Sequence, residues 1–352
     1  MSTIELDPGR RSGFRTIRSP YYAFRLNVRV IALSMVALGA LALLAIWAIS
    51  LGSYQMDYLD VLRAIAGRGS EDQLFVVRTI RLPRTICAVM IGAALAMSGA
   101  IFQGLVRNPL VSPDIIGINS GASLVAVVWI IYGLNGNLLP VAAFIGAIVT
   151  ATIIYLLAWK QGIAPGRLIL VGIGVGAAVS AATQFVTIRF PVEIVRPATV
   201  WIMGSVYATS WNDVIVITLS LTGLSIAAVV LARSLRVLQL GDDLGRGLGL
   251  SLERTRLSLI VVGCGLSAVA VAIAGPIGFV ALMIPHMARI LAGPVSGTGI
   301  LFTGILGGCF LLGADVIANH FLPVTLPVGV VTAAVGAPYF LFLLYRSRLG
   351  VS

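Results

Sequence analysis

The sequence predicts an all-α polytopic membrane protein, and three observations support this fold class. The 352-residue chain is 59% hydrophobic and only 11% charged, whereas an ordinary soluble domain is about 25% charged. Its mean hydropathy is +1.03, and apolar runs of roughly the 20 residues that a spanning helix needs recur from Val30 to Leu344. These runs are continuous, which argues against the alternating ten-residue segments of a membrane β-barrel.

The apolar runs predict ten spans and place both chain ends on one side of the membrane. A basic tail, residues 1–29, precedes the first span, and Arg346 and Arg348 follow the last. Because positive residues beside spans stay in the cytoplasm, we expect both termini there, with residues 30–352 forming one domain in the cytoplasmic membrane. The net charge of +11 therefore does not indicate nucleic-acid binding. The predicted spans are 30–52, 85–106, 115–133, 138–159, 168–188, 212–232, 257–275, 279–293, 299–320 and 328–345.

A short motif occurs twice, at a separation of half the chain. Gly99 begins Gly-Ala-Ile-Phe-Gln on the second span, and Gly275 begins Gly-Pro-Ile-Gly-Phe at the end of the seventh, 176 positions later. Five spans separate the two copies, so they point in opposite directions and predict an inverted repeat of spans 2–5 and 7–10. Matching interrupted segments in two halves indicate the transport path of a transporter. We expect Gly99, Gly275 and Pro276 to break helices beside that path and to act as pivots.

The fifth predicted span carries a stripe of small and polar residues. At 100° per residue the stripe falls within an arc of about 80°. Such a stripe either packs helices closely or lines a water-filled path. We assign its glycines, Gly172 and Gly176, to packing. The candidates for the path are Ser180, Thr183, Gln184 and Thr187.

Residues 233–256 form the longest segment predicted on the cytoplasmic side. Asp242 and Asp243 can begin a short helix there, because acidic residues favour helix N-termini. A glycine can end that helix, and Ser251 can cap the next one. Two short helices joined by glycine would form a rigid projection suited to a groove on a cytoplasmic partner. At this point an ordinary solvated loop with arginines fits equally well.

Arginines also precede the second span on the predicted outer side, against the usual bias. Arg81 and Arg84 could pair with carboxylates of a docking protein. The residues alone slightly favour the alternative that they lie at the membrane interface or pair with Glu71 and Asp72. Asp315, near the outer end of the ninth span, favours a hydrogen-bond network at the helix end over a proton relay, because no second deep acidic residue accompanies it.

The sequence shows no nucleophile–base pair, no spacing of metal ligands and no Gly-x-x-x-x-Gly-Lys phosphate loop. We therefore expect a chain that is not an enzyme, cannot itself hydrolyse ATP, and binds neither a metal nor a cofactor. Its three cysteines, each within an apolar run, are interpreted as small core residues.

Together these segments resemble the permease subunits of ABC importers for iron–siderophore complexes, a FecCD-like family that also includes the vitamin B12 permease. The resemblance implies the type II importer fold, with ten spans, a dimer of permeases seated on two ATPase subunits, and an extracytoplasmic binding protein that delivers the substrate. The matching segments are 81–84, 98–103, 107–110, 112–117, 241–243, 248–250, 275–279, 284–286 and 326–332.

The resemblance also assigns roles to the two undecided sites. It implies that the segment 233–256 presses on the ATPase and that Arg81 and Arg84 contact the binding protein. The residues implied in ATPase coupling are Asp242, Asp243, Leu244, Arg246, Leu248, Gly249, Leu250, Glu253 and Arg254.

One departure from the family pattern concerns the docking charges. Many members carry Arg and Glu at the positions of Asn319 and Thr325. Asn319 therefore marks a docking position without its charge, which favours pairing with a second, related permease chain over a homodimer.

The expected function is import of a ferric siderophore, and vitamin B12 or haem is the alternative cargo. An ion-coupled secondary transporter is a rival of another class, and the shortage of deep acidic residues argues against it.

Overall fold

The computed structural model describes residues 14–19, 22–160, 162–294 and 297–348. In these residues the regular secondary structure is helical apart from an antiparallel hairpin of β1 (Phe14–Ser19) and β2 (Tyr22–Asn27) in the N-terminal tail and an isolated bridge between Trp159 and Ile163. The helices are α1 (Val28–Ser50), α2 (Tyr58–Ile65), α3 (Glu71–Leu74), α4 (Leu82–Val106), α5 (Ile118–Ile131), α6 (Leu139–Ala158), α7 (Pro165–Ile188), α8 (Val192–Ile202), α9 (Trp211–Gln239), α10 (Asp242–Gly247), α11 (Leu252–Ala274), α12 (Val280–Ala292), α13 (Gly297–Val316) and α14 (Val328–Arg348). A π-helical segment, η1 (Phe75–Arg81), joins α3 to α4, another, η3 (Ile317–Phe321), extends α13, and a 3₁₀ turn, η2 (Gly136–Leu138), precedes α6.

Each predicted span coincides with a helix, which confirms the fold class. Within the described residues, seven helical stretches are long and apolar enough to cross a membrane. The three other predicted spans correspond to shorter apolar helices, α5, α12 and α14. The number of actual crossings therefore stays a prediction, because length and composition alone do not place these three.

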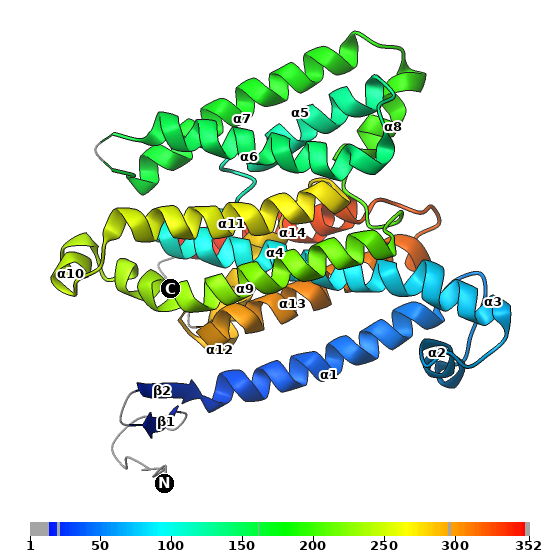
Figure 1. The fold of residues 1–352 in the computed structure, drawn as a ribbon, viewed down its shortest axis with the longest axis horizontal. Helices are drawn as coiled ribbons and strands as arrows, with labels where there is room; N and C mark the ends of the chain where they lie inside the picture. The colour runs from blue at the N-terminus through cyan, green and yellow to red at the C-terminus, as the bar shows by residue number, and fades with distance from the viewer. Residues whose placement is uncertain (1–13, 20–21, 161, 295–296, 349–352) are drawn as a thin grey trace.

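The helices lie along one long axis, and the loops gather at its two ends (Figure 1). The start of α1, the short helix α10 and the last part of α14 lie toward one end, which we call the α10 end. Helices α2, α3 and α8 lie at the opposite end, the α8 end. Helix α4 runs from the α8 end to the α10 end and α11 runs the other way. The two helices that carry the repeated motif are therefore antiparallel, as an inverted repeat requires.

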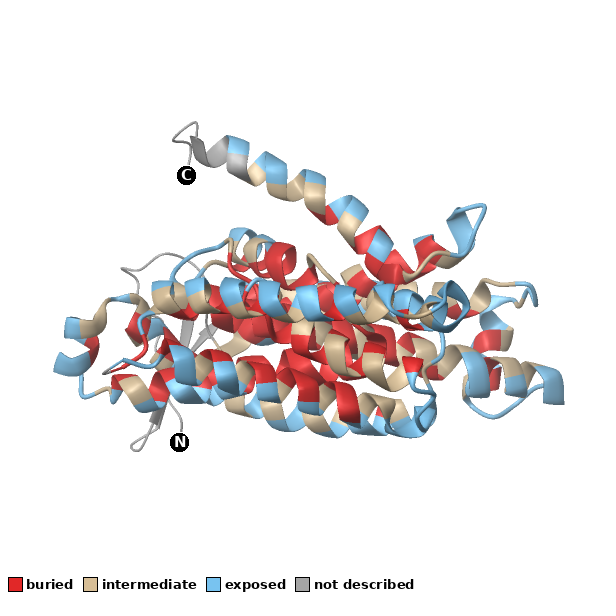
Figure 2. Ribbon diagram, turned by 90° about the horizontal axis from the view of Figure 1, so that it is seen from above, coloured by how far each residue is buried: buried red, intermediate tan, exposed pale blue. Residues whose placement is uncertain are grey.

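Helix α4 forms the centre of the bundle, in contact with α9, α11, α12 and α13. Buried residues gather along the middle of the molecule, whereas α14 lies away from it over much of its length (Figure 2). Lipid gives apolar helices little reason to associate, so close packing through small residues decides which helices pair. Gly92 and Gly307 show this directly, because a Cβ on either glycine would overlap the carbonyl of the other.

One local prediction needs correction, and two segments outside the predicted spans are helical. Helix α8 lies between two predicted spans, because eleven residues containing Pro197 give too weak an apolar signal to be predicted as a span. Residues 75–81 are helical, so Arg81 lies on a continuous rod that leads into α4. The cytoplasmic projection is one short helix, α10, and the predicted second short helix is the first turn of α11. Nothing interrupts the helical pattern after Ser251, so that helix continues into the bundle.

Candidate functional site

An ion pair between Arg84 and Asp315 lies at the α8 end of the bundle. Arg84, in the first turn of α4, donates from Nε to Asp315 Oδ2 at 3.0 Å and from Nη2 to Oδ1 at 2.7 Å. The two side chains are only 18% and 10% exposed. Asn319, one turn further on, donates to the backbone carbonyl of Asp315 at 2.6 Å and to its Oδ1 at 3.0 Å. The interpretation of Asp315 as part of a hydrogen-bond network at the helix end is therefore confirmed.

The three residues predicted to dock a binding protein all make bonds within the chain. Arg81 donates to the backbone carbonyl of Ile49 at 2.6 Å and to that of Tyr54 at 2.8 Å, which ties the end of α1 to the start of α4. Arg84 and Asn319 share Asp315, as described above. Their role in docking stays a prediction, and any external carboxylate would have to compete with these internal partners.

A cavity of about 640 Å³ opens beside this pair at the α8 end. Its wall combines the end of α8, the following link, the end of α11, and residues 325–327. Trp201 and Tyr207 supply aromatic rings, and Ser205, Asn319 and Thr325 supply polar groups. The Tyr207 ring lies 5.1 Å from the Arg84 guanidinium, so it covers the ion pair. An apolar wall with a few placed polar groups is typical of a small-molecule site.

The first copy of the repeated motif touches α12, the helix that follows the second copy, at the centre of the bundle. A Cβ on Gly99 would overlap the carbonyl of Ala281 on α12, so the backbones of α4 and α12 are in direct contact. Gln103 donates to the carbonyl of Leu282 at 2.9 Å and accepts a hydrogen bond from Arg289 at 2.6 Å. The side-chain amide thus joins the same two helices a turn further on.

The expected helix breaks are present at only one of the two positions. Gly275 ends α11 in a left-handed conformation with φ 72°, and Pro276 begins the non-helical link to α12. Gly99 lies inside an uninterrupted α4, so the expectation of a break there is wrong. Glycine is needed at that position for close approach and not for a turn. Whether Gly275 and Pro276 act as pivots stays a prediction.

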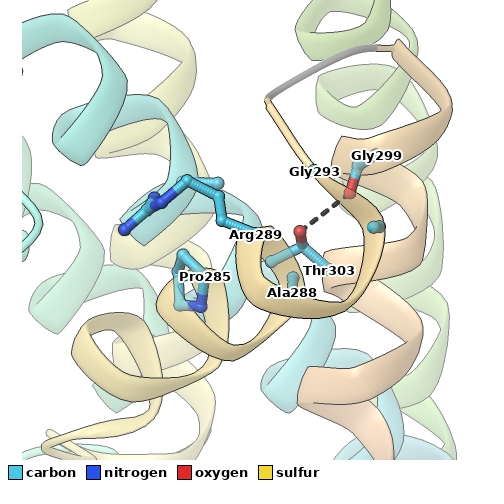
Figure 3. A pocket seen from close by; sticks show the side chains of 8 residues that line it. Pro285, Ala288, Arg289, Gly293, Gly299 and Thr303 are labelled. Carbon is cyan, nitrogen blue, oxygen red and sulfur yellow. Dashed lines mark hydrogen bonds between the residues drawn. The ribbon is translucent and has the colours of Figure 1, made fainter. Parts of the chain in front are cut away.

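A second pocket, between α12 and α13, is too small to bind a substrate. Its volume is about 10 Å³, and its lining includes Pro285, Ala288 and Gly293 (Figure 3). In its wall, the hydroxyl of Thr303 donates to the carbonyl of Gly299, one turn earlier on α13, at 2.8 Å. This volume admits at most one water molecule, so the pocket is a gap in the packing.

The polar stripe on α7 divides between two environments. A Cβ on Gly172 would contact the backbone of Ile116, which confirms close packing at that glycine. Thr183 is 8% exposed and donates to the carbonyl of Val179 at 3.0 Å. The role of Thr183 in a path stays a prediction. Ser180 and Gln184 are exposed and Thr187 is half-buried, so their role in a path stays a prediction.

The α10 end carries a network of ion pairs centred on Asp242. Arg256, on α11, donates to Asp242 Oδ1 at 2.8 Å and to Oδ2 at 2.7 Å. Arg107, at the end of α4, donates to Oδ1 at 3.0 Å. On the other side of α10, Leu244 and Leu248 are 60% and 66% exposed. The short helix is therefore held by charges on one side and presents leucines on the other.

Asp242 gives a pH-dependent contribution to stability. The hydrogen bond from Arg256 and the nearby positive charges hold the pKa of Asp242 below its ordinary value, against a smaller opposing effect of burial. A depressed carboxyl pKa stabilises the fold above the unfolded pKa, about 3.9, and this contribution is lost as pH falls through the folded pKa.

We expect Asp242→Asn to lower the Tm of the detergent-solubilised protein at pH 7, and the difference in Tm from wild type to shrink below about pH 4. Asp243→Asn, at a fully exposed carboxylate, is the matched control. A difference that grows on acidification contradicts the assignment.

Sequence reasoning did not single out several residues of these sites. Arg107 begins the family-like segment 107–110 but was given no role of its own, and Arg256 was indistinguishable from arginines that keep a loop in the cytoplasm. Tyr207 lies in a link with no recognisable pattern. Gln103 did offer a signal, since a lone amide within an apolar span needs a buried partner, but nothing in the sequence pointed to Arg289, 186 positions away.

Comparisons with known proteins agree on one family. The model of the FecCD transport family matches residues 40–346. A probable siderophore transport system permease of Bacillus subtilis is 40% identical over 324 residues, covering 89% of this chain and 94% of the relative. The ferric enterobactin transport system permease of Escherichia coli is 38% identical over 320 residues, covering 90% and 97%. A solved chain described as a metal-chelate type ABC transporter in an inward-facing conformation superposes with a TM-score of 0.82 at 27% identity, covering 90% of this chain and 99% of that chain.

Proposed function

The chain belongs to the FecCD transport family, and from that premise we propose that it is the membrane permease subunit of an ABC importer for a ferric siderophore. The match over residues 40–346 carries this proposal. Permease subunits of this family are not themselves enzymes, so ATP hydrolysis belongs to partner ATPase chains. The same family places the chain in a membrane as a multi-pass protein, in agreement with its long apolar helices.

The cavity at the α8 end supports a bulky chelate as the cargo. Its volume of about 640 Å³ is in the range of small-molecule sites. Asp315, the carboxylate in its wall, is neutralised by Arg84. A large ligand with aromatic groups can therefore enter without meeting an unpaired charge from this pair. Relatives named for haemin and cobalamin keep haem and vitamin B12 as alternative cargoes.

We assign the α8 end to the outer side, where an extracytoplasmic binding protein delivers the chelate, and the α10 end to the cytoplasm. The basic tail of residues 1–29 and the end of α14 lie on the cytoplasmic side in this assignment. The segment of residues 233–256 then provides the contact with the ATPase subunits through α10. The exposed Leu244 and Leu248 support this role, because solvent-exposed leucines on a short projecting helix suit a protein partner.

The coupling role predicts a large loss of transport when α10 loses its apolar face. We expect Leu244→Asp combined with Leu248→Asp to lower ATP-dependent uptake of a radio-iron chelate into vesicles at least tenfold, since central contact residues contribute about 2 kcal/mol or more. The ATPase subunits should also no longer co-purify with the variant. Both side chains are exposed, so the fold should persist.

The control for this experiment is Leu59→Asp, the same change at an exposed leucine of α2. It should leave uptake and co-purification unchanged. Unaltered uptake in the α10 variant removes the coupling role. Uptake driven by an ion gradient without any ATPase overturns the importer proposal itself.

A heterodimer is favoured as the membrane unit. Asn319 and Thr325, where many family members carry charges, both line the outer cavity. A homodimer would lack charges at these two positions on both halves, whereas a second, related permease would supply them on one. The vesicle assay tests this directly, because uptake should require a second permease chain in addition to the ATPase. Full uptake with this chain as the sole permease establishes the homodimer.

A further inference from the structure

The ion pairs at the α10 end extend from the short helix into two separate parts of the bundle. The first branch runs from Asp242 on α10 to Arg107, through a hydrogen bond of 3.0 Å. Arg107 is the residue at which α4 ends. Helix α4 contains Gly99 and Arg84, so this branch leads to the centre of the bundle and to the ion pair at the far end.

The backbone of Arg107 adopts a conformation that is uncommon for a residue with a side chain. Its φ is 59°, and Arg107 is one of two non-glycine residues with positive φ among the described residues. A left-handed conformation costs a residue with a side chain about 1–2 kcal/mol. The conformation turns the chain at the end of α4 and accompanies the bond from the guanidinium to α10.

The second branch runs through α11 to the link between α6 and α7. The side chain of Arg256 is only 8% exposed. One of its guanidinium nitrogens, Nη2, bonds Asp242, and the other, Nη1, lies 3.4 Å from Glu253 Oε1. The other carboxylate oxygen of Glu253 accepts a hydrogen bond from the backbone N–H of Ile163 at 3.2 Å. Arg167, in the first turn of α7, donates to the carbonyls of Ala158 and Gly162, each at 2.5 Å, and so fixes the same link to both helices.

We propose that Arg107 and Glu253 are positioning residues that transmit a displacement of α10 to α4 and to the α6–α7 link, respectively. This inference rests on the proposed function, in which the ATPase moves α10. Asp242 and Arg256 form the shared centre, and the two branches leave it in different directions. Glu253 thereby has an internal role, in place of the ATPase contact that the family resemblance implied. ATP hydrolysis therefore displaces α4 and the α6–α7 link only while the bonds of Arg107 and Glu253 are intact.

Substitution of Arg107 separates the first branch from the rest of the network. Arg107→Gln removes the charge that bonds Asp242 but leaves the pair between Asp242 and the buried Arg256 intact, so α10 stays attached to α11. In the complete importer reconstituted in vesicles, we expect ATP hydrolysis within about twofold of wild type and uptake per ATP lowered about threefold or more. Arg107→Lys retains a donor for Asp242 and should restore most of the coupling.

Two further variants complete the test. Glu253→Ala cuts the second branch and should lower uptake per ATP in the same way. Arg63→Gln breaks an exposed ion pair with Asp60 at the α8 end and serves as the matched control. It should leave both measurements unchanged.

The outcomes separate this inference from the proposed function. Absence of ATP-dependent uptake by the wild-type importer refutes the function, whatever the variants do. If the wild type transports and Arg107→Gln transports as much per ATP, the inference is wrong. It is also wrong if uptake and hydrolysis fall in proportion, because Arg107 then only helps to bind the ATPase. A lysine variant as poorly coupled as the glutamine variant excludes the ion pair as the cause.

Discussion

Asp315→Ala is expected to destabilise the protein by about 3–5 kcal/mol, because it leaves the charge of Arg84 buried without its partner. The guanidinium is 18% exposed and makes two hydrogen bonds to that carboxylate. Asn319 would lose an acceptor in the same step. The measurement is the thermal unfolding midpoint of the protein in detergent, together with the amount of folded protein recovered from membranes.

A double variant distinguishes an unpaired charge from a simple loss of packing. Replacing both partners, as Arg84→Met with Asp315→Leu, removes the charges together and should cost far less than the single change. If the single and double variants unfold at the same temperature, the buried charge is not what destabilises Asp315→Ala. Uptake by the double variant also tests docking, since it deletes Arg84 while retaining the fold.

Gly99→Ala is expected to have the second large effect, about 3 kcal/mol, because its methyl group would overlap the carbonyl of Ala281. That oxygen belongs to a backbone and cannot rotate away as a flexible side chain does. Helices α4 and α12 would have to separate, and the bonds of Gln103 to α12 would weaken with them. We expect a lower unfolding midpoint and a lower yield of folded protein.

Gly223→Ala is the matched control for this change. Gly223 lies within α9, and a Cβ there would meet nothing within 4 Å. Alanine favours a helix over glycine, so the control should be neutral or slightly stabilising. An unfolding midpoint of Gly99→Ala equal to that of the control contradicts the close approach of α4 to α12.

The fold was predictable to the extent that it depends on local hydrophobicity. An apolar run long enough to span a membrane has few alternatives to a helix, because an unpaired backbone in lipid is costly. The same logic fails for α8, whose eleven residues are too few to give that signal. Local hydrophobicity also could not show that the predicted second short helix and α11 are one element. A separate short helix and a continuous helix would have the same amino-acid composition.

The sites were predictable only in part, because their partners are remote in sequence. Arg84 was identified as important, but Asp315 lies 231 positions away and nothing local joins them. The repeated motif drew attention to Gly99, yet its function as a contact and not a break depends on where α12 passes. At the α10 end, Asp242 was placed at a helix start. Its bond to Arg107, 135 positions away, again needed the tertiary structure.

The antiparallel arrangement of α4 and α11 has an electrical consequence. These helices are 25 and 23 residues long, touch one another, and run in opposite directions. The peptide dipoles of a helix add up along its axis, so those of two neighbouring antiparallel helices oppose each other and largely cancel. The central pair therefore adds little field of its own along the bundle.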